Sequence, residues 1–395
     1  MDIVPQKVIV GLSFWLYWFS LSTYIPILPT YAKELGASYQ MIGVILGSYG
    51  LTQVLLRLPL GIISDRLDRR KVFLIAGTIL GLVGSLGMWL FRDIYCLLFF
   101  RLLSGIAATA WVLQTVFFVH CYRPADSGKA MGLVNAIVNS GEMSAMFAGG
   151  LVAQYYGQEQ SFLLAALIAL PALVCSLVVR EVPAQTARAP VRPGDIVAMA
   201  RNWSLALPSL LGMMIQVISF GTVFSFVPLV AKNLGASFAE IGLLPMIYLL
   251  PGILASLLSA TFFRRVFSER VMVTGGFLMM AAGCFVIPFV PDIITLFVTQ
   301  AIAGFARGLV FPILMSLGIR DVAGHRQATA MGFFQTIYGM GMLLGPLAVG
   351  VIIGGVGMVW GFAFVGMAGL TGAGAAWAAF LTKPITKEPI SDRSF

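Results

Sequence analysis

Charged residues are scarce in this chain. Only 10% of its 395 residues are Asp, Glu, Lys or Arg, and 59% are hydrophobic. A typical soluble domain carries about 25% charged residues. This balance excludes an ordinary soluble globular protein and indicates an integral membrane protein.

Cysteine and histidine are also scarce, with four and two residues. The cysteines are scattered through or beside apolar runs, without the spacing of a disulfide framework or a metal site. We interpret them as small buried hydrophobic residues. No nucleotide-binding glycine loop or nucleophile elbow is evident. We therefore expect a protein that is not an enzyme and that binds no metal and no cofactor.

Long apolar runs are abundant. A membrane-spanning helix needs about 20 predominantly apolar residues. Runs of this kind predict an all-α membrane protein with twelve transmembrane helices, at residues 8–31, 40–61, 71–91, 94–118, 129–153, 160–180, 204–231, 240–262, 271–290, 293–318, 328–354 and 358–381.

Basic residues predict the orientation of these runs. The gaps after even-numbered runs and the two termini hold most Lys and Arg residues, whereas the opposite gaps hold only Lys33, Arg92 and Lys232. Basic residues favour cytoplasmic loops. We predict a multi-pass protein of the cell (inner or plasma) membrane with both termini in the cytoplasm. The net charge of +9 lies in these loops and does not indicate nucleic acid.

An internal repeat divides the chain. Residues 29–45 recur as residues 228–244, and glycines of residues 130–150 recur in residues 330–350. Each copy holds six helices, which is an even number, so both copies cross the membrane in the same orientation. Such halves enclose a substrate path between them. We predict an N-terminal six-helix bundle at residues 1–182, a cytoplasmic linker at 183–203, a C-terminal six-helix bundle at 204–382 and a cytoplasmic tail at 383–395.

Residues 61–71 carry a family resemblance. Their pattern is Gly, three residues, Asp-Arg, a two-residue turn and Arg-Arg-Lys, with Asp68 where the family usually has Gly. The segment resembles the loop between the second and third helices of the major facilitator superfamily. The resemblance implies a cytoplasmic gate, in which the Asp closes against the start of helix eleven and an arginine bridges to the next cytoplasmic loop. The implied gate residues are Gly61, Asp65, Arg66, Arg69, Arg70 and Asp126.

Further motifs resemble the drug:proton antiporter branch of this family. Residues 101–108 resemble its Arg-x-x-x-Gly element in helix four, and residues 26–31 resemble its start. Residues 341–350 resemble the antiporters' Gly-x-x-x-Gly-Pro element. In the family this element lies in helix five, where the copy at residues 141–150 lacks the proline. The resemblance implies two pseudo-symmetric six-helix bundles, with helix-packing positions Gly141, Gly341, Gly345 and Pro346.

Glu142 is the one acidic residue in the middle of a predicted span. Its counterpart in the repeat is Met342, so the fold does not require a carboxylate there. An ionisable group in the bilayer interior is costly and indicates function, which predicts proton or substrate coupling. A fixed ion pair between helices four and five is the structural alternative. Arg101, at a comparable depth in the adjacent span, is the expected partner, and the resemblance implies that it takes part in proton transfer.

Arg307 is a third deep charge, without an acid in its own half. It either attracts an anionic substrate or packs on backbone carbonyls, and both interpretations stay open. Asn135, Asn139 and Glu142 are spaced by four and three residues, so they share one helix face and predict a polar cavity wall. The other candidates for the substrate cavity are Gln114, Gln216, Tyr24 and Phe224.

These observations together predict a secondary active transporter. We expect a monomer in the lipid bilayer that exports small hydrophobic or amphipathic molecules in exchange for protons by alternating access. The first alternative is a proton-coupled importer or symporter of a polar metabolite or organic anion. The second is a membrane sensor or lipid-handling protein with the same fold.

Overall fold

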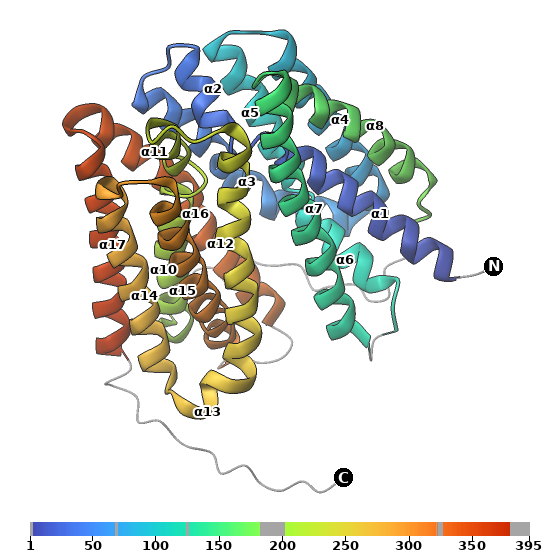
Figure 1. Cartoon of the computed structure of the whole chain (residues 1–395). Coiled ribbons are helices and arrows are strands. Elements are labelled where there is room, and N and C mark those ends of the chain that lie inside the picture. The colour runs from blue at the N-terminus through green and yellow to red at the C-terminus, as the bar shows by residue number, and fades with distance from the viewer. Residues whose placement is uncertain are drawn as a thin grey trace, which may run out of the picture.

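The computed structural model describes residues 3–67, 70–123, 126–181, 202–320, 322 and 327–379. Every regular element in these ranges is helical (Figure 1). The first half of the chain forms α1 (Ile3–Ser22), α2 (Leu28–Glu34), α3 (Tyr39–Leu67), α4 (Arg70–Leu90), α5 (Ile94–Ala108), α6 (Trp111–His120), α7 (Ser127–Tyr156) and α8 (Gln160–Val178). The second half forms α10 (Trp203–Gly221), α11 (Val227–Asn233), α12 (Phe238–Leu258), η2 (Ser259–Phe263), α13 (Arg264–Val266), α14 (Glu269–Val286), η3 (Ile287–Phe289), α15 (Ile293–Arg320), α16 (Gln327–Val356) and α17 (Met358–Ala379).

Ten helices in the described ranges are long and apolar enough to cross a membrane. The other two predicted spans correspond to α1, which has 20 residues, and α7, which has 30 residues. Both pack among the ten, with α1 and α7 each in contact with α8. The predicted all-α membrane fold is therefore confirmed.

Three of the predicted runs are interrupted rather than continuous. Turns at residues 23–27 separate α1 from α2, and a break at residues 222–226 separates α10 from α11. Proline has no amide N–H to donate and suits the first turn of a helix. Pro29 and Pro228 occupy that position in α2 and α11. The breaks fall at equivalent places in the repeat, and a shorter one at Thr109 separates α5 from α6.

The two ends of the helices differ in composition. One end has four turns in which a glycine adopts a φ between 84° and 101°, a left-handed conformation that favours glycine: Gly36, Gly157, Gly235 and Gly357. These residues form two repeat-related pairs, which explains why the glycine turns recur in the sequence. We call this the glycine end; it lies near α2 and α11 at the top of Figure 1. The basic end is opposite and carries Arg70, Lys129, Arg264 and Arg320.

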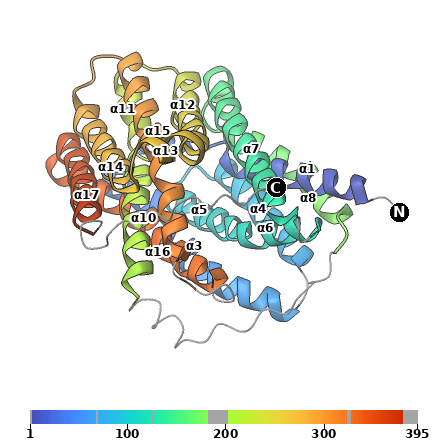
Figure 2. The same ribbon diagram turned by 90° about the horizontal axis from the view of Figure 1, so that it is seen from below.

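Glycines bring the two halves of the chain into backbone contact near the glycine end. There α3 packs against α16 and α7 packs against α12 (Figure 2). A methyl group added at Gly350 would lie 2.6 Å from the Tyr39 carbonyl oxygen, and one added at Gly150 would lie 2.6 Å from that of Phe238. Small residues allow such close approach in lipid. The repeat relates Tyr39 to Phe238 and Gly150 to Gly350. The contact of Gly350 with Tyr39 is therefore equivalent to the contact of Gly150 with Phe238.

Packing between the halves is looser toward the basic end. A methyl group added at Gly128 or Gly132 of α7, or at Gly332 of α16, would meet nothing within 4 Å. Met131 and Leu133 of α7 are exposed, at 43% and 45%. The two halves are therefore in closer contact at the glycine end than along these parts of α7 and α16.

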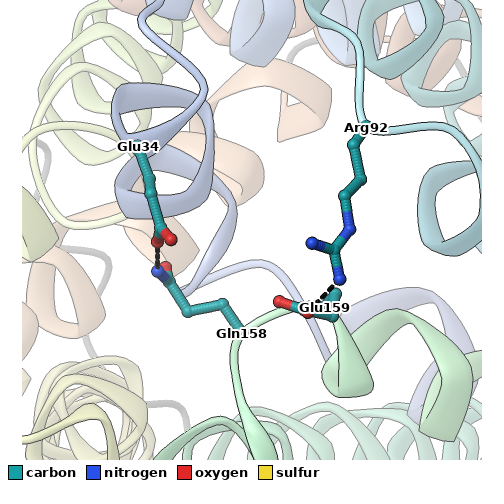
Figure 3. A network of polar contacts seen from close by, with 4 residues as sticks. All are labelled: Glu34, Arg92, Gln158 and Glu159. Carbon is teal, nitrogen blue, oxygen red and sulfur yellow. Dashed lines mark hydrogen bonds and ion pairs between the residues drawn. The ribbon is translucent and has the colours of Figure 1, made fainter.

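A polar network holds the glycine end of the first half together (Figure 3). The Gln158 amide donates to the Glu34 carboxylate and accepts a hydrogen bond of 2.8 Å from the Thr30 hydroxyl. Arg92 pairs with Glu159 at 2.5 Å. An exposed ion pair contributes at most about 1 kcal/mol. The network therefore positions α2, the α4–α5 connection and the α7–α8 turn rather than supplying much of the stability.

Candidate functional site

Glu142 lies in the middle of α7 and is partly exposed. Helix α7 packs on α12 of the other half of the chain, and α12 packs on α15, which carries Arg307. Among the ion pairs of the described residues, none joins Glu142 to Arg101. The expected pairing between adjacent spans is thus not present in this state.

Arg101 faces α3 and the α1–α2 connection. Its guanidinium carbon lies 4.6 Å from the ring centre of Tyr49 and 5.8 Å from that of Tyr24. The side chain is only 3% exposed, and its Nε and Nη1 have no hydrogen-bond partner. The Tyr24 hydroxyl donates to Ser104 at 2.9 Å. The charge of Arg101 is therefore held by aromatic faces, with donors left unused.

Arg307 has a related environment in the second half. Its guanidinium carbon lies 5.4 Å from the ring centre of Phe311 and 6.0 Å from that of Tyr248. The Tyr248 hydroxyl lies 2.7 Å from that of Ser219. The Nε of Arg307 is buried without a hydrogen-bond partner. Tyr248 follows Tyr49 by 199 residues, the spacing of the repeat, so each half places one arginine against the same tyrosine position.

A series of aromatic rings joins these two arginine sites. Tyr49 stacks on Phe220 across the halves, with ring centres 6.4 Å apart and planes at 15°. Phe220 contacts Phe224 at 5.1 Å, and Phe224 meets Tyr248 edge-on at 6.0 Å. We call Tyr49, Phe220, Phe224 and Tyr248 the aromatic ladder. The predicted cavity residue Phe224 is one of its members, whereas Tyr49 and Tyr248 were not predicted.

The uncharged candidates are dispersed. Asn135 is exposed, and its amide donates to the Met131 carbonyl of its own helix at 2.8 Å; Asn139, one turn further along α7, is partly exposed. Gln114 is buried and accepts a 2.7 Å hydrogen bond from the Trp18 indole. Gln216 is buried in α10, and its amide oxygen has no hydrogen-bond partner. The structure thus places two of the four on the helix of Glu142.

Arg57 of α3 adds a third guanidinium between the halves. Its Nη1 donates to the Tyr338 hydroxyl of α16 at 3.2 Å, and its Nη2 donates to Gln53 at 2.7 Å. Arg57 thereby bridges α3 and α16, and its Nε is buried without a hydrogen-bond partner.

Part of the predicted gate lies within the described residues. Helix α3 continues through Leu67, so Gly61, Asp65 and Arg66 lie on one helix, but their side chains and Arg69 are outside what the structure describes. Asp126 lies 3.7 Å from Lys129 of its own turn. The gate therefore stays a prediction.

At the basic end, α4 begins on a carboxylate. The backbone amides of Arg70 and Lys71 donate to Glu181 at 2.9 and 3.0 Å. A carboxylate at a helix N-terminus is favourable because amide donors and the helix dipole both point at it. The Arg70 guanidinium, expected at the gate, lies 2.7 Å from His120 Nδ1 and is buried.

The predicted helix-packing positions lie in close helix contacts. A methyl group added at Gly141 would lie 2.8 Å from the Trp15 carbonyl of α1, and one added at Gly345 would lie 2.7 Å from the Val217 carbonyl of α10. Gly341 also faces α10, and the carbonyl of Pro346 faces Gly43 of α3. These positions need a small residue because backbone atoms occupy the space of a side chain.

The site as a whole offers charges and rings. In the described ranges, no three His, Cys, Asp or Glu side chains gather in a way that could hold a metal ion. Three guanidinium groups can bind an anion, one carboxylate can exchange a proton, and the ladder offers apolar faces. Groups of these kinds bind and release a solute without covalent chemistry.

Comparison with known proteins identifies the family. The model of the Major Facilitator Superfamily matches residues 10–211 and 209–394. The chain is 22% identical over 336 residues to an uncharacterized MFS-type transporter of Methanocaldococcus jannaschii, covering 83% of this chain and 86% of that protein. It is 22% identical over 357 residues to the quinolone resistance protein NorA of Staphylococcus aureus (strain COL), covering 88% and 89%. The crystal structure of the nucleoside transporter NupG shares the fold, with a TM-score of 0.74 at 18% identity and coverage of 97% and 100%. The chain belongs to the Major Facilitator Superfamily.

Proposed function

We propose that this transporter moves small amphipathic molecules by alternating access and couples their movement to protons at Glu142. The observation that carries the proposal is the position of Glu142 in the middle of α7, a helix that packs on α12 of the other half. An ionisable residue inside the bilayer is functional by default. When the halves rock, a contact between them is made in one state and broken in the other. The surroundings of Glu142 therefore change with the state of the protein.

Alternating access is supported by the asymmetry between the two ends. The halves are in backbone contact near the glycine end, where Gly150 meets Gly242, and are looser near the basic end. Basic loops favour the cytoplasm. We infer that the basic end and both termini are cytoplasmic and that the described state opens inward. The residue ranges proposed for the two bundles and the linker follow the same division.

The direction of transport has two candidates. The relative NorA is named for quinolone resistance, which favours export in exchange for protons. The unpartnered guanidinium nitrogens of Arg101 and Arg307 favour a different solute, an organic anion taken up together with protons.

Reconstituted vesicles test the coupling. With a pH gradient imposed in either direction, the wild type should accumulate a member of a compound panel against its concentration gradient. Glu142→Gln should retain downhill flux and lose the accumulation. Glu159→Gln, the same substitution in the network at the glycine end, should behave as the wild type. Accumulation by Glu142→Gln at the wild-type level would remove the proton role of Glu142.

A further inference from the structure

We propose that the solute is an aromatic anion. This inference rests on the proposed function, because it names the solute class at the same site. It is carried by the unused guanidinium donors of the site and by the aromatic ladder.

The charges of the site favour an anion. The site holds three arginines, Arg57, Arg101 and Arg307, and one carboxylate, Glu142. Each of the three guanidiniums has a buried Nε without a hydrogen-bond partner. Arg101 is 3% exposed and has a second unused donor, Nη1. A buried donor without an acceptor is costly, and guanidinium donors match the geometry of a carboxylate. A bound anion would supply the acceptors that the protein itself does not.

The rings of the site favour an aromatic solute. Tyr49, Phe220 and Phe224 are partly exposed, so their faces are not fully used by the protein. Aromatic pairs attract each other beyond the effect of buried area. The ladder runs from the ring beneath Arg101 to the ring beside Arg307. A flat aromatic solute with one negative group can therefore stack on the ladder and pair with an arginine at the same site.

Binding to the full-length protein in nanodiscs tests the solute class. The probes are naphthoate, its neutral amide naphthamide, the cation naphthylmethylammonium and the non-aromatic cyclohexanecarboxylate. Naphthoate should bind about 10- to 100-fold more tightly than naphthamide, the range for a hydrogen bond to a charged group. It should also bind more tightly than the cation and the non-aromatic acid.

Substitutions of Arg307 locate the binding site. Arg307→Gln should reduce naphthoate affinity to that of naphthamide and leave naphthamide affinity unchanged, which also shows that the variant is folded. Arg307→Lys should restore part of the preference. Arg92→Gln, at the glycine end, should retain all of it.

Equal binding of all four probes, or tighter binding of the cation, would overturn the inference. Gradient-driven flux of cations in exchange for protons would also overturn it while leaving the proposed function intact. Absence of any gradient-driven flux would instead contradict the proposed function itself.

Discussion

Gly242→Ala should weaken the closure of the glycine end. A methyl group added at Gly242 of α12 would lie 2.8 Å from the Met146 carbonyl oxygen and 2.9 Å from the Gly150 Cα. Both are backbone atoms of α7, so no side-chain rotation relieves the contact and the two helices must move apart. In the state that is open at the glycine end, α7 and α12 are already apart, so the added methyl group meets no backbone there. The substitution therefore penalises one state and spares the other.

The size of the shift follows from the cost of overpacking. Forcing extra atoms into a well-packed contact costs about 1–3 kcal/mol. Because about 1.4 kcal/mol changes an equilibrium tenfold, the ratio of the two states should shift by about 5- to 140-fold. A shift of this size makes a minor state of about 1% directly visible.

Distances between spin labels at the glycine end measure the shift. Lys33 of α2 and Lys232 of α11 are equivalent in the repeat and lie on helices that contact each other across the halves. Cysteines introduced there, in a variant without the four native cysteines, should give one short distance in the wild type. Gly242→Ala should add a longer distance. Gly275→Ala, in α14, is the matched control because its methyl group meets nothing within 4 Å.

An unchanged distance distribution in Gly242→Ala would refute the reasoning, since the backbone clash would then be absorbed within the closed state. A longer distance in Gly275→Ala as well would be equally damaging. It would assign the effect to the helix propensity of alanine rather than to the contact.

Two further substitutions test local contacts by thermal unfolding. Hydrogen bonds from the backbone amides of Cys96 and Tyr95 lower the pKa of Asp93, so this carboxylate stabilises the fold above its ordinary pKa and loses that effect as the pH falls through the lowered value. The stability advantage of the wild type over Asp93→Asn should therefore shrink as the pH falls below the ordinary pKa of an aspartate, about 3.9, and an advantage that is constant with pH would contradict this. The buried Tyr17 hydroxyl donates to the Ala107 carbonyl at 2.5 Å, so Tyr17→Phe should cost about 1 kcal/mol, whereas Tyr95→Phe, at an exposed ring, should cost nothing measurable.

Much of the fold could be predicted because its signals are local. Apolar runs of spanning length and the repeat of residues 29–45 each depend on composition or spacing alone. The breaks at residues 23–27 and 222–226 were missed because these turns are as apolar as the helices beside them. Their signal is the proline that follows each break.

The charged residues of the site could be predicted from the sequence, but the residues that each of them contacts could not. Glu142 and Arg307 stand out as charges within apolar runs. Depth along neighbouring helices cannot tell which face a side chain occupies, and Arg101 faces Tyr49 rather than Glu142. The repeat could have revealed Tyr49 and Tyr248, since they are 199 residues apart, but tyrosines in an apolar run attract no notice without a charge beside them.

The duplicated glycine contact makes this chain resemble a homodimer fused into one polypeptide. In a true dimer with an isologous interface, each residue occurs twice, so a carboxylate at Glu142 would be accompanied by a second one at the position of Met342. Fusion removes that constraint. The surfaces that move can stay identical, with Gly43 and Gly242 making the same contact, while each half acquires its own chemistry. Both halves keep the glycine contact on which they move, whereas the carboxylate of Glu142 occurs in one half alone.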